Sequence, residues 1–324
     1  MRLGKNPAKL RDNNKVENKA FHQIIIPVFL PELKGYYREG LEILKLCIES
    51  IYLTTHNKTF ISVVNNGSCQ EVRTYLDQCL KNKKIHEVIH TSAIGKINAI
   101  AKGLSGHNFD LITLTDADIL FKNGWQKGVY DIYKAFPKAG MVGSSTNPLG
   151  ENYLTENIFF ENALNRNITS ESPDNYEDVK LGYTSVRREI NDIENIKLKT
   201  ILSNNVKAVI GSGHSCSTYR RECLKSFYNF KPSKYKMGGH VMKKYIDFPV
   251  NELGLWRLTT FKNYTYHLGN VKENWMIDKF KKIEMENSVP YLFLNKMPSK
   301  QPKLLIKLKS AFARKFIIQK NVQK

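Results

Sequence analysis

Short runs of apolar, mostly β-branched residues alternate with helically spaced apolar positions along the first half of the chain. The compact runs predict buried strands, and they occupy residues 22–29, 59–64, 85–90, 111–115 and 140–144. Between them, apolar side chains at helical spacing predict helices over residues 41–51, 72–79, 97–104 and 125–136. Strands that alternate with helices in this way predict an α/β fold, with a mostly parallel sheet flanked by helices on both faces.

The alternation is interrupted between residues 152 and 205, where the chain is polar, charged and poor in regular apolar spacing. We expect an insertion here that packs over the ligand edge of the sheet, with a plain surface excursion as the alternative. A strand at 206–210 restores the pattern, and Leu255 and Leu258 predict a later helix that begins at Glu252. These boundaries divide the chain into a polar leader (1–20), one α/β domain (21–285) and a basic tail (286–324).

Two carboxylates follow the strand predicted at 111–115. Asp116 and Asp118 are separated by one small residue, so on extended backbone they project to the same side. Ligands of open α/β sheets bind outside the carboxyl ends of the strands, which is where this pair falls. Oxygen ligands suit a hard divalent cation such as Mg²⁺ or Mn²⁺. The alternative is an acidic turn without a ligand.

The charge balance requires an anionic partner. Lys and Arg outnumber Asp and Glu by 50 to 30, which gives a formal net charge of +20. Nucleic acid, an anionic membrane surface and phosphorylated substrates all fit this excess. The basic residues are dispersed, however, and no helix-turn-helix, zinc-finger or RNA-recognition pattern is visible, so we expect no nucleic-acid partner.

The cysteines and the apolar runs indicate a compartment. The five cysteines form no Cys-x-x-Cys pair, which favours free thiols in a reducing environment. No apolar run is long enough to span a bilayer, and residues 1–20 lack the apolar core of a signal peptide. We therefore expect a cytoplasmic protein.

The tail contains a basic amphipathic segment over residues 303–318. Its apolar side chains fall on one helical stripe, with Lys and Arg largely off it; the stripe consists of Leu305, Leu308, Phe312 and Phe316. This combination is typical of helices that lie in the plane of an anionic bilayer, so we expect a peripheral protein at the inner membrane face. Packing on the catalytic domain or on a second copy in an oligomer is the alternative.

The order of motifs in the first half resembles the family-2 glycosyltransferases of the GT-A fold, a Rossmann-like arrangement. In that family the first strand ends near a proline, matched by Pro27 and Val28, and the second ends in Asp-Asp-Gly-Ser, matched here by 65–68 with Asn65 and Asn66. A Gly-Lys-x-x-Ala pattern matches 95–99, and the family's Asp-x-Asp falls on 116–118. The resemblance implies donor contacts by Pro27, Val28, Asn65, Asn66, Gly95, Lys96, Asp116 and Ala117. Because Asn65 and Asn66 are neutral amides, base recognition survives but the identity of the base stays open.

The second half supplies three further site predictions. The family places its general base in an acidic motif after the Asp-x-Asp, and the candidates here are Asp247, favoured because it precedes Phe-Pro in an exposed or turn context, and Glu252. A Gly-rich turn with Gly213 and His214 resembles the turn that lines the sugar pocket. His267 ends a strand-like stretch and would complete a metal shell with Asp116 and Asp118, unless it is a core histidine.

The resemblance implies a metal-dependent enzyme that moves a sugar from a nucleotide-diphosphate sugar to a hydroxyl of a glycan or glycolipid acceptor. Inversion at the anomeric carbon and a role in surface polysaccharide or lipopolysaccharide synthesis follow from the same resemblance. A sugar-1-phosphate nucleotidyltransferase is an alternative, but residues 27–39 contain a single glycine instead of a Gly-rich phosphate loop. A non-enzymatic nucleic-acid-binding protein and an inactive relative are the others. The donor sugar, the acceptor and the oligomeric state stay open.

Overall fold

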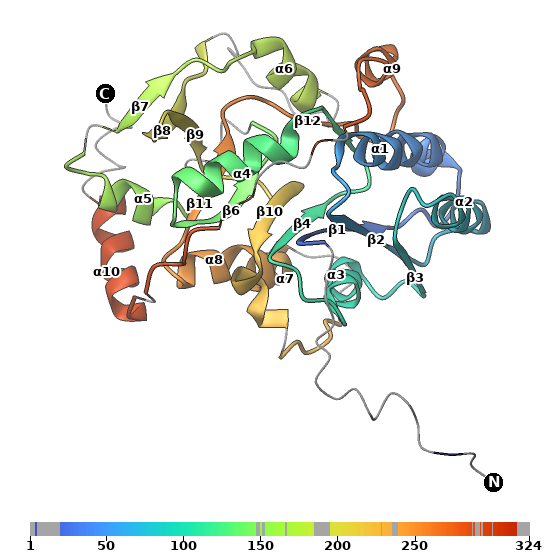
Figure 1. The fold of residues 1–324 in the computed structure, drawn as a ribbon, viewed down its shortest axis with the longest axis horizontal. Helices are drawn as coiled ribbons and strands as arrows, with labels where there is room; N and C mark the ends of the chain where they lie inside the picture. Colours follow the sequence, from blue (N-terminus) through green and yellow to red (C-terminus); the bar gives the residue numbers. More distant parts are fainter. Residues whose placement is uncertain are drawn as a thin grey trace.

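The computed structural model describes residues 4, 20–146, 150, 153–165, 167–184, 195–227, 229–234, 239–286, 288, 292, 294–299 and 301–315. Within these ranges, helices cover a large central sheet whose strands follow the order β3-β2-β1-β4-β10-β6-β11-β9-β8-β7 (Figure 1). The predicted α/β fold with a mostly parallel sheet is confirmed.

The N-terminal part of the sheet is parallel. Its strands are β1 (His22–Val28), β2 (Thr59–Asn66), β3 (Glu87–Thr91) and β4 (Leu111–Thr115). The helices between them are α1 (Gly40–Thr54), α2 (Gln70–Lys81) and α3 (Lys96–Leu104). All these elements lie where the apolar pattern predicts them, because each strand is a compact apolar run and each helix has one apolar stripe.

The C-terminal part of the sheet is mixed. β10 (Cys216–Arg220) runs antiparallel between β4 and β6 (Ala139–Gly143), and β11 (Trp256–Thr260) lies parallel to β6. β9 (Val206–Ile210), β8 (Leu198–Ser203) and β7 (Ile168–Glu171) complete the edge with antiparallel pairs. A separate pair joins β5 (Ile119–Phe121) to β12 (Thr265–His267).

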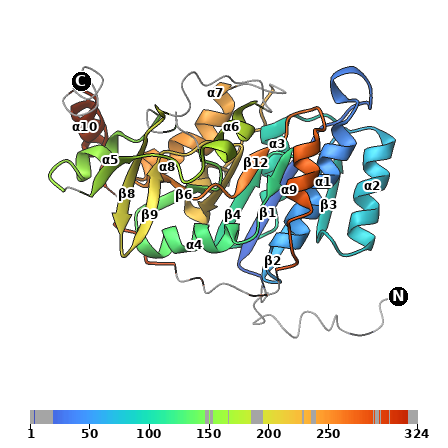
Figure 2. The ribbon, with the colours of Figure 1, turned by 90° about the horizontal axis from the view of Figure 1, so that it is seen from above.

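The remaining helices have nine residues or fewer, apart from α4 and α10 with 11 each. They are the 3₁₀ turn η2 (Gly35–Tyr37), α4 (Trp125–Ala135), α5 (Glu156–Glu161), α6 (Tyr176–Thr184), the 3₁₀ helix η5 (Arg221–Phe227), α7 (Gly239–Met242), the π-helical turn η6 (Lys243–Asp247), α8 (Phe248–Glu252), α9 (Asn274–Phe280) and α10 (Lys303–Ala313). Seen from above, α7, α10 and the loop after β1 lie along one edge of the molecule (Figure 2).

Both faces of the sheet are buried, as its apolar strands require. In β1, Ile24 and Ile26 pack into one core cluster and Ile25 into the other, and all three side chains are fully buried. Helix α3 lies so close to the second face that a Cβ on Gly103 would meet Ile25 at 2.8 Å. This alternation of successive side chains between two cores is the reason why the strand reads as an uninterrupted apolar run.

Two strands of the C-terminal half differ from the prediction. The helix expected from Glu252 through Leu258 is wrong: α8 ends at Glu252, and β11 begins at Trp256. Gly254, at φ +70°, ends the helix because its backbone is left-handed. Leu255 and Leu258 are buried as core residues around the start of a strand, so their spacing imitates a helical repeat. β10 was not predicted either, because its sequence Cys-Ser-Thr-Tyr-Arg is polar although all five residues are buried.

The stretch over 152–205 contributes structure to the sheet. β7 and β8 extend the edge formed by β9, while α6 packs against β12. All five cysteines are free thiols, in agreement with the prediction. Across the ranges given above, no helix has the length and apolarity needed to span a membrane.

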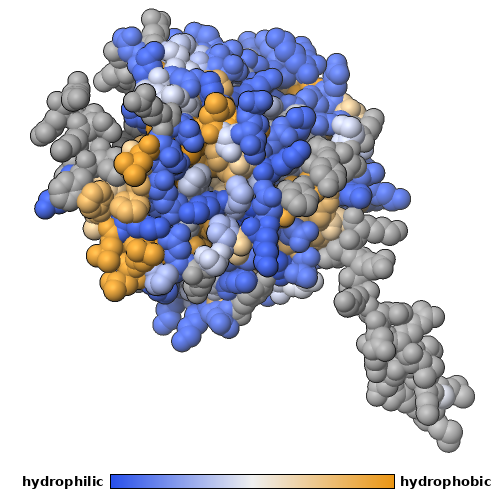
Figure 3. Space-filling model, turned by 60° about the vertical axis from the view of Figure 1, so that its left-hand side comes forward, coloured by the Kyte–Doolittle hydropathy of each residue, from blue (hydrophilic) through white to orange (hydrophobic). Residues whose placement is uncertain are grey.

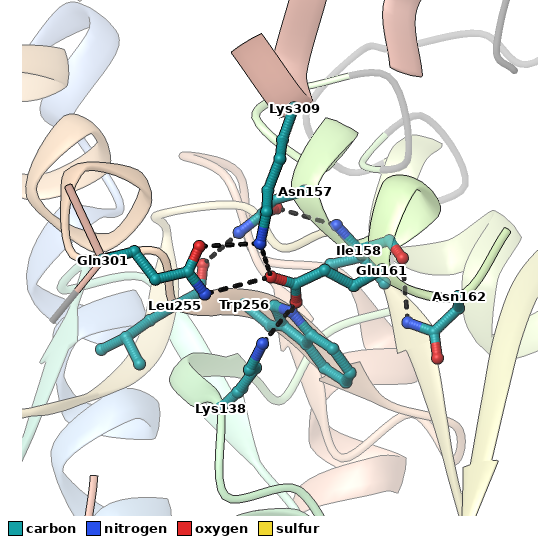
Figure 4. A network of polar contacts seen from close by, with 9 residues as sticks. All are labelled: Lys138, Asn157, Ile158, Glu161, Asn162, Leu255, Trp256, Gln301 and Lys309. Atoms are coloured by element: carbon teal, nitrogen blue, oxygen red, sulfur yellow. Dashed lines mark hydrogen bonds and ion pairs between the residues drawn. The ribbon is translucent and has the colours of Figure 1, made fainter. Parts of the chain in front are cut away.

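Helix α10 packs on α5, and a buried carboxylate joins the two (Figure 4). Glu161 Oε2 accepts bonds from Lys138 Nζ and Trp256 Nε1, both at 2.8 Å, while Oε1 lies 3.1 Å from Lys309 Nζ and 3.3 Å from Gln301 Nε2. Burial raises the pKa of Glu161, but these donors outweigh it and hold the pKa below its ordinary value. The tail predicted over 286–324 thus includes a helix docked on the α/β domain; Phe316 lies outside the described residues.

Candidate active site

The carboxyl ends of β1, β2 and β4 surround a cavity of about 480 Å³. Its lining includes the following predicted donor-side and metal residues: Pro27, Asn66, Gly95, Lys96, Asp116, Ala117, Asp118 and His267. Of the other predicted donor contacts on this side, Val28 is fully buried at the end of β1, and Asn65 stands beside the cavity without lining it. Side chains from separate motifs therefore meet at one edge of the sheet, as expected of an open α/β fold.

Asp116, Asp118 and His267 converge in this cavity. One ligand atom from each side chain lies within 4.8 Å of the others. The pairing of β12 with β5 brings His267 there, and Leu268 N–H donates to the Asp118 carbonyl oxygen at 2.7 Å, which fixes the two backbones together. His267 Nδ1 lies 3.5 Å from Asp118 Oδ2. Two carboxylates and an imidazole are a donor set that fits Mn²⁺ or Mg²⁺.

The ionisation of Asp118 fits a cation site. Burial raises the pKa of its carboxyl, and the neighbouring Asp116 raises it further, while His267 and Lys96 act in the opposite direction. Two carboxylates held together in a partly dry site repel each other. A divalent cation would relieve this repulsion, so the electrostatics favour an occupied site.

Lys96 stands at the start of α3 and forms an ion pair with Asp116. Asn66 places it there: its Oδ1 accepts the backbone N–H groups of Ile94 at 2.8 Å and Gly95 at 3.1 Å. Gly95, at φ +93°, supplies the left-handed turn into the helix. A cation and free backbone N–H groups at a helix start are suited to bind phosphate.

Asn65 has a different role from Asn66. Its Oδ1 accepts the Ser68 N–H at 2.9 Å, and its Nδ2 donates to His90 Nδ1 at 2.9 Å. His90 in turn bonds Asp77 at 2.9 Å. The Asn65 amide is thus held in one orientation by the turn after β2 and by its neighbour on β3.

Three aromatic side chains of the cavity were not predicted. Phe29, Tyr36 and Tyr37 lie in the loop between β1 and α1, and Tyr37 packs edge-on against the other two at centroid distances of 6.2 and 5.1 Å. Tyr36 is 70% exposed and Phe29 is 42% exposed. The available signal was a group of large aromatic residues in a loop directly after the first strand.

Asp247 lies in a second group of polar residues and is fully buried, so the exposed context predicted for it is wrong. Its Oδ1 pairs with Arg257 Nη1 at 3.1 Å, and its Oδ2 accepts the Tyr153 hydroxyl at 3.3 Å. Burial and the Asp247 charge raise the pKa of Tyr153 to about 12, so this hydroxyl keeps its proton. The Phe-Pro that follows begins helix α8 at its first turn, where proline is tolerated, instead of marking an exposed turn.

The Gly-rich loop over 211–215 connects this group with the cavity. Asp116 N–H donates to the Ser215 carbonyl at 2.8 Å, and Arg257 Nη2 donates to the Ser212 carbonyl at 2.7 Å. The Gly213 carbonyl accepts the Ser217 hydroxyl at 2.6 Å. Gly213 and His214 therefore lie between the Asp116 end of the cavity and Asp247.

Glu252, the other candidate base, lies elsewhere. It is the exposed last residue of α8 and lines a separate cavity of about 470 Å³ between α8 and α10. Sequence reasoning missed Tyr153 and Arg257: Tyr153 lies in the polar region after β6, and Arg257 is a fully buried cation in a strand that was read as a helix.

Comparisons with known proteins identify the family. The family model described as glycosyl transferase family 2 matches residues 35–193. The mannosyltransferase PcManGT from Pyrobaculum calidifontis, solved with GDP-Man and Mn²⁺, is 15% identical, with a TM-score of 0.42 over 74% of this chain and 54% of its own. S. aureus TarS 1-349, solved with UDP-GlcNAc, is 12% identical, with a TM-score of 0.43 over 82% of this chain and 68% of its own.

The chain spans about half the length of the mannosyltransferase. Among curated proteins, no significant match is found. The family match begins at η2 and ends after α6, so it contains β2, β3 and β4 of the parallel part of the sheet, without β1, and the Asp116–Asp118 motif. Residues 35–193 therefore match the domain of glycosyltransferase family 2, and the chain has the GT-A fold.

Proposed function

We propose that the protein transfers a sugar from a nucleotide-diphosphate sugar to a hydroxyl group of a glycan or glycolipid acceptor, using Mn²⁺ or Mg²⁺. The observation that carries the proposal is the convergence of Asp116, Asp118 and His267 beside Lys96 in the cavity at the strand ends. The alternatives, a nucleotidyltransferase and a nucleic-acid-binding protein, have no support in the family match.

The cavity contains what a nucleotide-diphosphate sugar requires. The bound cation would neutralise charge on the diphosphate leaving group. Gly95 and Lys96, at the start of α3, line the same cavity and would hold phosphate oxygens. Phe29, Tyr36 and Tyr37 offer ring surfaces to the nucleoside, which explains why such apolar side chains stay exposed.

The group around Asp247 would serve the acceptor. Inversion requires the acceptor hydroxyl to attack the anomeric carbon from the side opposite the leaving group, so the proton acceptor must stand apart from the phosphates. Gly213 and His214 separate Asp247 from Asp116, which fits this requirement. We place the sugar of the donor against this loop.

The experiment is a binding and turnover measurement on the whole protein. Calorimetry with UDP, GDP and CDP, each with and without Mn²⁺, should give metal-dependent binding of at least one nucleotide. A panel of the matching nucleotide sugars should then be hydrolysed slowly, with water replacing the acceptor. Binding that is equal in excess chelator would exclude the metal mechanism.

Helix α10 supports a second proposal, that the enzyme works at the cytoplasmic, inner face of a membrane during surface polysaccharide or lipopolysaccharide synthesis. Its outer face leaves apolar side chains exposed, at 69% for Leu304, 42% for Leu305, 60% for Leu308 and 50% for Phe312. Apolar side chains gather on the left of the face drawn in Figure 3, where this helix lies. Together with a net charge of +20, this surface fits an anionic bilayer.

A further inference from the structure

The carboxylate of Asp247 is closed off on every side that the structure describes. Its side chain is 1% exposed, with Arg257 on one oxygen and the Tyr153 hydroxyl on the other. A general base must come within about 2.6–3.2 Å of the proton that it removes. An acceptor hydroxyl cannot make that approach to Asp247 while Tyr153 occupies Oδ2.

His214 is the exposed neighbour of this carboxylate. Its Nδ1 lies 3.8 Å from Asp247 Oδ2, and its side chain is 48% exposed. Nδ1 is the ring nitrogen near the carboxylate, so Nε2 is the nitrogen left for a substrate. An imidazole held by a buried carboxylate through one nitrogen is suited to accept a proton at the other.

Arg257 fixes the two partners relative to each other. The same guanidinium pairs with Asp247 through Nη1 and donates to the Ser212 carbonyl through Nη2 at 2.7 Å. Ser212 lies two residues before His214, and the Ser217 hydroxyl braces the intervening Gly213 carbonyl at 2.6 Å. The loop that presents His214 is therefore anchored to the cation that holds Asp247.

We infer that His214 is the catalytic base of the proposed transfer and that Asp247 is its positioning residue. His214 Nε2 takes the proton of the acceptor hydroxyl while Nδ1–H faces Asp247 Oδ2. The acceptor oxygen forms the new bond to the anomeric carbon, and the bond from that carbon to the diphosphate oxygen breaks, its electron pair leaving with the nucleoside diphosphate. The proton passes from the exposed imidazole to solvent.

Other charged or titratable groups around this pair come from four segments, one of which is β10 with the buried Tyr219, whose hydroxyl is affected by the charges of Asp247 and Arg257. Arg257 belongs to β11, Tyr153 precedes α5, and Lys243 of η6 lies 5.6 Å from the centroid of the Tyr153 ring. Arg257 also stands over the same ring at 4.9 Å. Asp247 is the anion of this group, so it is the natural partner for an imidazolium.

The inference rests on the proposed function, and its test uses hydrolysis of the nucleotide sugar that wild-type protein turns over fastest, with Mn²⁺ present. His214→Ala should lower kcat by at least about 100-fold, the usual contribution of a general base. Donor affinity, measured separately by calorimetry, should stay within about twofold. His107→Ala, the same change at a histidine paired with Glu87 away from the site, should behave as wild type.

Two further readouts separate a base from a structural residue. Added imidazole should restore part of the activity of His214→Ala, because the exposed position leaves room for it. His214→Gln, which keeps a polar side chain but cannot act as the base, should lose as much kcat as His214→Ala. Asp247→Asn should lower kcat with donor affinity unchanged, and imidazole should not rescue it.

The outcomes are distinct. If His214→Ala keeps at least a third of the wild-type rate while Asp247→Asn is inactive, Asp247 acts directly and the inference is wrong. If His214→Ala is inactive and added imidazole has no effect, the catalytic role is also rejected. If wild-type protein binds no nucleotide with Mn²⁺, the proposed function itself has failed.

Discussion

The donor side and the acceptor side of the site are built in different ways. On the donor side, residues follow the ends of parallel strands in chain order: Asn66 is the last residue of β2, Lys96 comes before β4 and Asp116 directly after it. The acceptor side is built from four separate segments: the stretch before α5 with Tyr153, the loop between β9 and β10 with His214, the turn η6 with Asp247, and β11 with Arg257. Parallel strands bring consecutive motifs to one edge, so a series of motifs along the chain becomes a site, whereas antiparallel additions do not preserve this order.

The two sides also treat their carboxylates differently. Asp118 is 30% exposed, beside another acid and a histidine, and its raised pKa reflects an uncompensated site. Asp247 is buried against a guanidinium and a hydroxyl, so its charge is already compensated by the protein. The arrangement at Asp118 leaves room for a ligand, whereas the arrangement at Asp247 holds the side chains around it in fixed positions.

The largest expected effect tests the donor side. Asp118→Ala should lower nucleotide-sugar hydrolysis by at least about 1000-fold, since it removes a ligand of the cation that stabilises the leaving group. The midpoint of thermal unfolding should not fall, because burial already disfavours this charge in the folded protein. Mn²⁺-dependent nucleotide binding by calorimetry should disappear with it. An active variant would mean that the three side chains do not hold the metal.

The next effect tests whether the acceptor side is fixed by its ion pair. Arg257→Met should lower the free energy of unfolding by about 3–5 kcal/mol, because it leaves the Asp247 charge buried without its cation. The double variant Arg257→Met with Asp247→Asn should recover much of this loss, since removing both charges of a buried pair is close to neutral. Urea unfolding of both proteins provides the comparison. Equal losses would show that the pair is not what stabilises this region.

A smaller effect concerns the outer surface of the acceptor half. Leu304→Glu with Leu308→Glu should reduce sedimentation with vesicles of phosphatidylglycerol by about tenfold or more, because two exposed apolar side chains no longer enter the bilayer. Leu202→Glu is the control, because this leucine of β8 is also exposed, at 50%, but lies outside α10; it should bind as wild type. Binding should weaken as salt rises. Unchanged sedimentation would assign this face to packing with another protein.

The smallest effect tests the rejected base. Glu252→Gln should change hydrolysis by less than about twofold, because this exposed carboxylate lines the cavity between α8 and α10 and has no contact with Asp247 among the described residues. Steady-state rates with saturating donor and Mn²⁺ measure it. A loss comparable to that of Asp247→Asn would require the acceptor to bind along α8 instead.

The sequence predicted the fold and the gathering of its motifs at one edge of the sheet, because each element there has one apolar signal and each motif follows a strand. It failed where burial and polarity diverge. β10 is a fully buried strand with the sequence Cys-Ser-Thr-Tyr-Arg. Its Thr218 and Arg220 bond to Thr113 and to the Ala139 carbonyl, which lie far away in the chain. β11 carries a buried arginine for the same reason, since its counter-ion Asp247 belongs to another element.

The predicted role of His267 illustrates the same limit. The end of a strand before a glycine was a valid signal for position, but only the pairing of β12 with β5 brings this histidine to the acids. The Gly-rich turn indicated that His214 belongs to the site, but nothing in the sequence indicated that it lies beside Asp247. The positions of His267 and His214 both depend on contacts between segments far apart in the chain, which the spacing of residues in the sequence does not reveal.

The contact between α5 and α10 has a consequence for how such chains can diverge. Arg314, at the end of α10, is the cation that pairs with the buried Glu156 at 2.5 Å. Loss of the tail would leave Glu156 buried without that partner, whereas Glu161 would keep Lys138 and Trp256. We therefore expect related proteins without this helix to have another residue in place of Glu156 and to keep Glu161.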